Sequence, residues 1–254
     1  MTVRPPAVAG QFYTAEPDEL AREVRQYLAS APPGGVQPAG VIVPHAGHMY
    51  SGPVAAHAYR TLRETDRVVL AGPAHFVPVA GIAAPACSTW RTPLGDIEID
   101  QDAISDLGVA VDDYPHGPEH SLEVQLPFLQ EQLRPGWTLL PLLVGRADPF
   151  VVADVLEPFL RDPSSVVVLS TDLSHYLPYA QAQRRDEMTA ARIVAGDWQD
   201  IADDDACGAH PLRGLLVAAQ RADMPIRLLD LRNSGDTAGP HSRVVGYGAF
   251  TVGL

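Results

Sequence analysis

Three histidines follow apolar runs of the chain, at the points where buried strands would end. His45 follows a Val-Ile-Val-Pro run, and His75 and His175 come a few residues after runs reading RVVLA and SVVVLS. Ligands bind just beyond the carboxyl ends of the strands in open α/β sheets. An imidazole in that place can hold a metal or move a proton near neutral pH. We therefore expect these histidines to share one cleft.

The types of side chain at the strand ends predict a metal site. His45 and His75 are the predicted imidazole ligands, and Asp236, which follows a predicted strand at 226–231, is the predicted carboxylate ligand. Two imidazoles and one carboxylate on one face of a metal leave positions open and favour ferrous iron. Zinc and copper are the alternatives. Asp236 also has a simpler interpretation, because a Ser-Gly-Asp sequence is common in turns.

The remaining polar residues of the cleft receive catalytic or supporting roles. His175 is the predicted general acid or base, oriented by Asp172 three residues earlier. His120 is a further catalytic candidate, and both it and Glu123 are expected at the rim, where they could hydrogen-bond a ligand. For each single histidine, the alternative is a loop residue that hydrogen-bonds a backbone carbonyl. The residues predicted to pack around the ligands are Glu123, His48, Cys207 and His210.

Strand and helix patterns alternate along the chain. Apolar runs predict strands that include 41–43, 67–71, 138–144, 165–170 and 226–231, and a hairpin at 90–100. Amphipathic spacing and capping residues predict helices at 14–30, 51–62, 120–133, 148–160, 179–194 and 211–222. This alternation indicates a single α/β domain over 1–254, with a mainly parallel, mixed central sheet and helices on both faces. No linker or repeat divides the chain.

Composition excludes several classes of protein. The net charge of −13 argues against nucleic acid and anionic membrane surfaces, which attract clustered basic residues. No apolar window is long enough to cross a membrane. Two cysteines cannot build a disulfide framework, and the amino terminus lacks the apolar core of a signal peptide. We expect a cytoplasmic protein that acts on a small molecule.

Several motifs in order along the chain resemble one known family. The segments VPHAGHMYSG, GPAHFVP, EHSLEVQLPF, STDLSHY, CGAHP and SGD…SRVVGYGAF are similar to those of the Memo family, whose microbial members are called AmmeMemoRadiSam system protein B. The resemblance implies a fold related to the class III extradiol (LigB-type) dioxygenases. It also implies that His45 and His75 bind metal, that His175 acts as base beside Asp172, and that His120 is a second pocket histidine.

The resemblance leaves the third ligand open. Animal members look to use a cysteine near the C-terminal strand and the dioxygenases use a glutamate, whereas this sequence has no cysteine after Cys207 and carries Asp236 at roughly that place. The family name further implies two partners, an AMMECR-type protein and a radical SAM enzyme.

Three functions fit these residues. The first is a metal-dependent redox enzyme, dioxygenase-like, in which oxygen or an aromatic diol binds a ferrous iron. The second is a zinc hydrolase that uses the same ligands to activate water. The third is a non-catalytic module whose cleft holds a peptide or a carboxylate.

Overall fold

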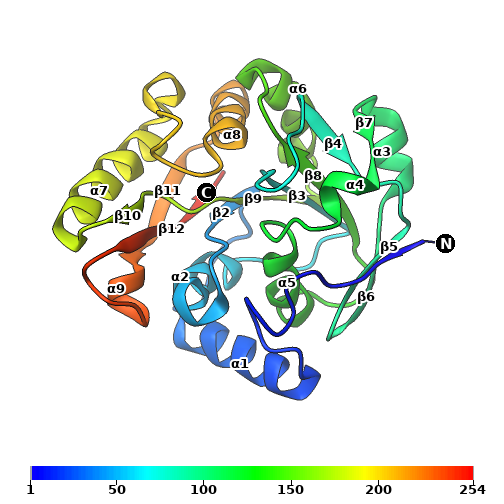
Figure 1. Cartoon of the computed structure of the whole chain (residues 1–254). Helices are drawn as coiled ribbons and strands as arrows, with labels where there is room; N and C mark the ends of the chain where they lie inside the picture. The colour runs from blue at the N-terminus through cyan, green and yellow to red at the C-terminus, as the bar shows by residue number, and fades with distance from the viewer. Residues whose placement is uncertain (1, 254) are drawn as a thin grey trace.

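Four parallel strands form the centre of the fold in a computed structural model, which describes residues 2–253 (Figure 1). Side by side, these strands are β2 (Gly40–Val43), β9 (Ser165–Ser170), β3 (Arg67–Pro73) and β8 (Thr138–Val144). Nearly every residue in them is buried, as expected for Val- and Leu-rich strands covered on both faces. Their carboxyl ends meet at one edge of the sheet.

Further strands on both sides make the sheet mixed. On one side, β12 runs antiparallel to β2, and β10 and β11 run antiparallel to β12. On the other side, β4 runs antiparallel to β8, and β7 is parallel to β4. The predicted mixed α/β sheet is therefore confirmed. These outer strands are β4 (Ile82–Ala84), β7 (Ala110–Val111), β10 (His175–Leu177), β11 (Ile226–Asn233) and β12 (Val244–Val252).

Helices lie against the sheet in separate groups (Figure 1). In one group α1, α2 and α5 contact one another, and α2 also contacts β2 and β12; in another, α6 and α8 pack together against β9. Helix α7 packs against β10, β11 and β12. No helix within residues 2–253 is both long and apolar enough to span a membrane. The helices of this fold are α1 (Pro17–Ser30), α2 (His48–Tyr59), α3 (Gln101–Leu107), α4 (Asp113–His116), α5 (Leu126–Gln132), α6 (Pro149–Arg161), α7 (Tyr179–Ala195), α8 (Ala209–Arg221) and α9 (Ser234–Thr237), with 3-10 turns η1 (Glu123–Gln125) and η2 (Trp198–Asp200).

Two predicted helix starts differ from the structure. Ser51 was expected to cap the second helix, but α2 begins at His48, and the Ser51 hydroxyl donates to the Ala46 carbonyl from within the first turn. The helix predicted from 120 begins as the 3-10 turn η1 and becomes α5. The predicted cap of α6 is confirmed, because the Asp148 carboxylate accepts from the Phe150 amide at 2.7 Å.

A small second sheet carries the amino-terminal segment. The predicted hairpin is confirmed as β5 (Thr89–Thr92) and β6 (Gly95–Glu98). The strand that pairs with it, β1 (Val3–Arg4), runs parallel to β5 and was not predicted. Two residues are too few to show a periodic pattern.

Glu123 anchors this amino-terminal segment and does not lie at a cleft rim, which corrects the sequence-based expectation. Its fully buried carboxylate accepts from the Arg4 guanidinium at 2.6 Å, from the amides of Ala7 and Val8 at 2.7 and 3.0 Å, and from the Tyr13 hydroxyl at 2.7 Å. Both carboxylate oxygens are thereby committed to groups far away in sequence.

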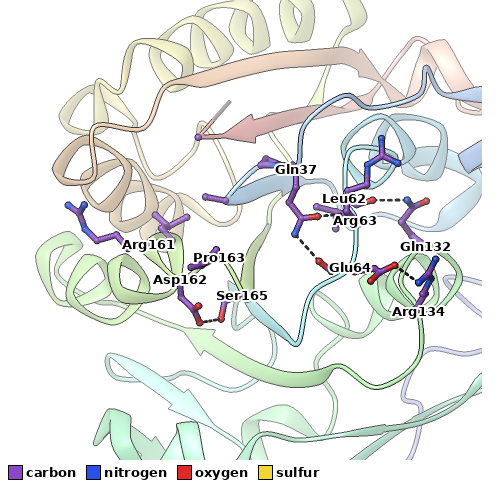
Figure 2. A pocket seen from close by; sticks show the side chains of 14 residues that line it. Gln37, Leu62, Arg63, Glu64, Gln132, Arg134, Arg161, Asp162, Pro163 and Ser165 are labelled. Carbon is purple, nitrogen blue, oxygen red and sulfur yellow. Dashed lines mark hydrogen bonds and ion pairs between the residues drawn. The ribbon is translucent and has the colours of Figure 1, made fainter.

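A cavity lies at the opposite edge of the sheet, where the parallel strands begin (Figure 2). It has a volume of about 680 Å³. Its polar side chains are largely engaged with neighbours: Gln37 with the backbone of Arg63 and Glu64, and Arg134 with the Glu64 carboxylate. This cavity contains none of the histidines and is not the candidate site.

The buried Glu123 pair makes a stability prediction. Replacing Glu123 with Ala leaves the Arg4 guanidinium buried without its counter-charge, a change that costs about 3–5 kcal/mol. The matched control is Glu64→Ala, which breaks the exposed Arg134 pair and should change stability by less than about 1 kcal/mol. Urea unfolding followed by circular dichroism measures both. Equal stability losses in the two variants would contradict the anchoring role.

Candidate metal centre

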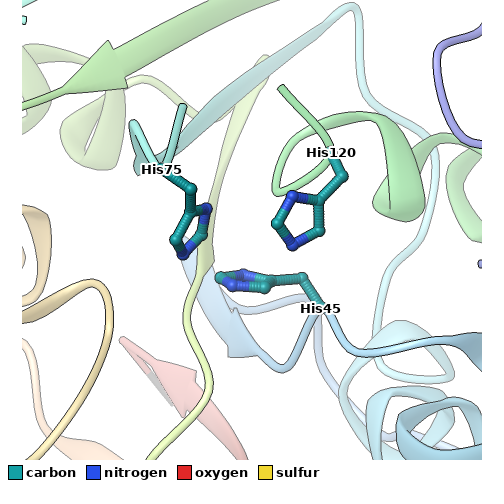
Figure 3. Close-up of side chains that lie close together, drawn as sticks. All are labelled: His45, His75 and His120. Atoms are coloured by element: carbon teal, nitrogen blue, oxygen red, sulfur yellow. The ribbon is translucent and has the colours of Figure 1, made fainter. Parts of the chain in front are cut away.

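Three imidazoles from separate segments face one another at the carboxyl edge of the sheet (Figure 3). His45 follows β2, His75 follows β3, and His120 precedes η1. Their ring centroids lie 5.2 Å apart for His45 and His75, 5.5 Å for His45 and His120, and 4.7 Å for His75 and His120. One nitrogen from each ring lies within 4.8 Å of the others, a spacing at which the group could hold one metal ion. The predicted gathering of His45 and His75 is therefore present, with His120 as the third member.

The hydroxyl of Ser170 determines which nitrogen of His45 faces the other rings. This hydroxyl donates its only proton to the Ser121 carbonyl at 2.6 Å and accepts from the Gln125 side-chain amide at 2.8 Å. The contact of 2.8 Å between His45 Nδ1 and the Ser170 oxygen must then be donated by the ring, because a hydroxyl has one proton and two acceptor positions. His45 Nε2 consequently carries the lone pair.

Glu119 fixes the second ring in the same way. Its carboxylate accepts from the Nδ1 of His75 at 2.9 Å and from the His75 amide at 2.5 Å, and the same oxygen that meets the ring lies 3.2 Å from His120 Nδ1. A carboxylate has no proton to give, so His75 Nδ1 donates, and in the neutral form of the ring Nε2 carries the lone pair. The sequence analysis did not select Glu119, although it stands directly before His120 in the loop.

Burial and the neighbouring rings disfavour a positive charge on His45. Burial lowers the pKa of His45 well below its ordinary value, and the neighbouring His75 and His120 lower it further. Burial raises the pKa of Glu119, but the adjacent His120 and His75 side chains outweigh burial and hold that pKa well below its ordinary range. A neutral imidazole beside an ionised carboxylate is the arrangement found around metal-binding histidines.

Cys207, predicted as a supporting residue, lies in direct contact with the Nε2 atom of His45. Its sulfur is 3.2 Å from His45 Nε2 and accepts from the Asp172 amide at 3.2 Å. Burial, followed by the Asp172 carboxylate, raises the pKa of the thiol to about 12. The sulfur therefore carries its proton at neutral pH and can donate it to the His45 ring.

Asp172 positions His45 and does not hydrogen-bond to His175. Its carboxylate accepts from the His45 amide at 2.7 Å, and burial raises its pKa. The exposed His175 donates from Nδ1 to the Leu173 carbonyl at 2.8 Å, which leaves Nε2 as the basic nitrogen. His175 begins β10, three residues after Asp172 in the chain. The next residue, Tyr176, has a left-handed backbone with φ of 60°.

Asp236 is not brought together with the histidines. Its carboxylate accepts from the Asn233 amide at 2.9 Å and from the Tyr179 hydroxyl, which closes a capping box at the start of α9. Within residues 2–253, the only group of three or more potential ligands at metal spacing is His45, His75 and His120. His120 is therefore the third member of the group that could hold a metal ion, and Asp236 takes part in turn chemistry.

Two other predicted supporting residues lie on different sides of the centre. His48 is buried, stacks on Tyr13, and places Nε2 2.9 Å from the Val124 carbonyl, so it supports the packing below the site. His210 is in the first turn of α8 and lines a cavity next to His75 and Cys207.

Comparison with known proteins identifies the family of this chain. The family model described as Memo-like protein matches residues 4–251. A MEMO1 family protein of Methanopyrus kandleri is 37% identical, covering 97% of this chain and 98% of its own length. MEMO1 family proteins of Methanosarcina barkeri and Aquifex aeolicus are 37% and 34% identical and cover 98% and 97% of this chain, and 100% and 98% of their own lengths. The chain belongs to the Memo family.

The hydrogen bonds predict one tautomer for each of three histidine rings in the metal-free protein. We expect His45 and His75 to carry the proton on Nδ1, and His48 to carry it on Nε2, where it faces the Val124 carbonyl. Long-range ¹H–¹⁵N correlation spectra at neutral pH distinguish the two forms, and His48 serves as the internal control. A proton found on Nε2 of His45 would contradict the assignment.

Proposed function

We propose that this Memo family chain is a metal-dependent redox enzyme, dioxygenase-like in its chemistry and related in fold to the class III extradiol dioxygenases. The observation that carries the proposal is the convergence of His45, His75 and His120 at ligand spacing, with two of the rings locked so that Nε2 lone pairs are presented. Imidazole nitrogens suit iron, copper and zinc. The donor set therefore fits a divalent transition metal.

The residues around the centre have separate tasks in this proposal. Ferrous iron bound by the three imidazoles would supply the chemistry that activates oxygen at positions left open for substrate. His175 accepts a proton from the substrate on Nε2, since its Nδ1 is held by the Leu173 carbonyl. Ser170 and Glu119 keep the ligand rings in place, and the thiol of Cys207 offers a further donor beside His45.

A zinc hydrolase is the second candidate, and one observation favours it. Three imidazoles, without a carboxylate among the closest ligands, are a donor set known from catalytic zinc sites that keep a fourth position for water. With zinc, the base His175 would take the proton of the attacking water.

The proposed partners are an AMMECR-type protein and a radical SAM enzyme, and this part of the proposal rests on family membership alone. The substrate is proposed to be a small molecule.

Metal affinity tests the proposal directly. Ser170→Ala removes the acceptor of His45 Nδ1 and should weaken binding of ferrous iron or zinc about 10- to 100-fold, the usual effect of losing such a partner. His45→Ala combined with His75→Ala should abolish binding. The control Ser105→Ala removes an exposed hydroxyl that donates only to the Gln101 carbonyl, and it should leave affinity unchanged. Competition with a chromogenic chelator under anaerobic conditions measures all of them.

The outcomes separate the candidates. If the double histidine variant binds metal as tightly as the unaltered chain, the centre is wrong. If metal binds as expected, oxygen consumption with the iron-loaded protein supports the redox enzyme, whereas ester or amide hydrolysis restored by zinc without oxygen supports the hydrolase.

A further inference from the structure

A cavity opens beside the candidate metal centre, at the same edge of the sheet. It has a volume of about 560 Å³, which is within the range of small-molecule sites. His75 and Cys207 form the wall nearest the centre. Much of the remaining wall is apolar and is supplied by Pro73, Phe76, Pro78 and Val79. A ligand in this cavity would reach the histidines with one end while its apolar body covers these side chains.

The cavity also contains one permanent positive charge, from Arg146. This residue follows β8 as His45 follows β2 and His75 follows β3, so the fourth central strand also delivers a polar side chain to this edge. Two backbone hydrogen bonds hold Arg146 in place. Its amide donates to the Val79 carbonyl, and its carbonyl accepts from the Gly81 amide. Gly145 permits this close approach, because a Cβ there would lie 1.8 Å from the Val79 oxygen.

The guanidinium of Arg146 is uncommitted. Within residues 2–253 it makes no hydrogen bond or ion pair at bonding distance, whereas most arginines of this acidic chain are paired. The Arg146 charge contributes to the lowered pKa of Asp203, but the Asp203 carboxylate is paired with Arg213 at 2.7 Å. His210 lines the same cavity, and its ring makes no hydrogen bond within the described residues. Two donors therefore face the cavity without a protein acceptor.

We propose that this cavity binds the carboxylate of a small organic acid, with Arg146 as the principal donor, His210 as a second polar contact, and the apolar body of the acid directed toward the histidines. This proposal rests on the proposed function in one respect: the end of the acid that lies near the histidines is the end that would react there. The planar guanidinium matches a carboxylate through two parallel hydrogen bonds.

The charge and lining of the cavity favour a monoanion. A single guanidinium balances one negative charge, and apolar walls would leave the second charge of a phosphate ester dehydrated without a partner. The molecule is acidic, with a net charge of −13, so an uncommitted arginine next to the histidines provides a local attraction for an anion.

The test measures binding of 3-phenylpropanoate, phenylacetate and the neutral phenylacetamide to the whole chain by ligand-observed NMR and calorimetry, with and without zinc. We expect the acids to bind and the amide to bind at least tenfold more weakly. Arg146→Gln should lose at least tenfold in affinity for the acids, and Arg146→Lys should recover only part of that loss. Arg134→Gln, at the opposite edge of the sheet, is the matched control and should bind like the unaltered chain.

Metal affinity is measured on the same variants, so that the two proposals fail separately. Carboxylate binding that depends on Arg146 supports this inference even if the histidines hold no metal. Metal binding without any effect of Arg146→Gln on the acids overturns the inference and leaves the metal centre intact. Binding of the acids that requires zinc but not Arg146, or inorganic phosphate bound through Arg146 as tightly as the acids, also overturns it.

Discussion

Two hydrogen bonds, one donated by the buried His45 ring and one by the His75 ring, determine which nitrogens the two imidazoles present to the centre. His45 gives its Nδ1 proton to a Ser170 hydroxyl whose own proton is already committed to the Ser121 carbonyl, and His75 gives its Nδ1 proton to the carboxylate of Glu119. Neither acceptor leaves a choice of tautomer. If either bond were reversed, an N–H would point into the centre where a lone pair is needed, and a cation would be excluded.

The sheet explains why these bonds can form between distant parts of the chain. β2, β3 and β9 are parallel neighbours, so His45, His75 and Ser170 arrive at one edge although they are far apart in sequence. The loop before η1 then adds Glu119 and His120 above the strand ends, and Cys207 comes from the segment before α8. The same edge receives Arg146 from β8. Each segment supplies one or two groups, and only the complete fold makes a site.

The sequence predicted most of this edge, because buried parallel strands are apolar runs that end abruptly in polar residues. The positions of His45, His75 and the mixed sheet follow from that pattern. Asp236 also follows a strand, but it is not part of the histidine group, and its carboxylate closes a capping box with Asn233 and accepts from Tyr179. Nothing in a local pattern distinguishes a carboxylate that caps a short helix from one that faces a cleft.

The other differences depend on contacts between distant residues. From its place near His120, Glu123 was expected at the rim of the cleft. Its ion-pair partner Arg4 lies 119 positions away in the chain, so no local pattern indicates their contact. Glu119 and Ser170 have no signal of their own, since their roles depend on which ring nitrogen reaches them. Arg146 was overlooked because it follows β8 after one glycine and lies outside the histidine motifs.

X-ray absorption spectroscopy of the metal-loaded protein tests the central claim most directly. The account predicts a metal bound by three imidazole nitrogens at about 2.0–2.1 Å, with the characteristic outer-shell scattering of histidine rings, and a reduced imidazole count when His120 is replaced by Ala. A first shell composed of oxygen atoms alone, unchanged by replacing His45, His75 or His120, would contradict it.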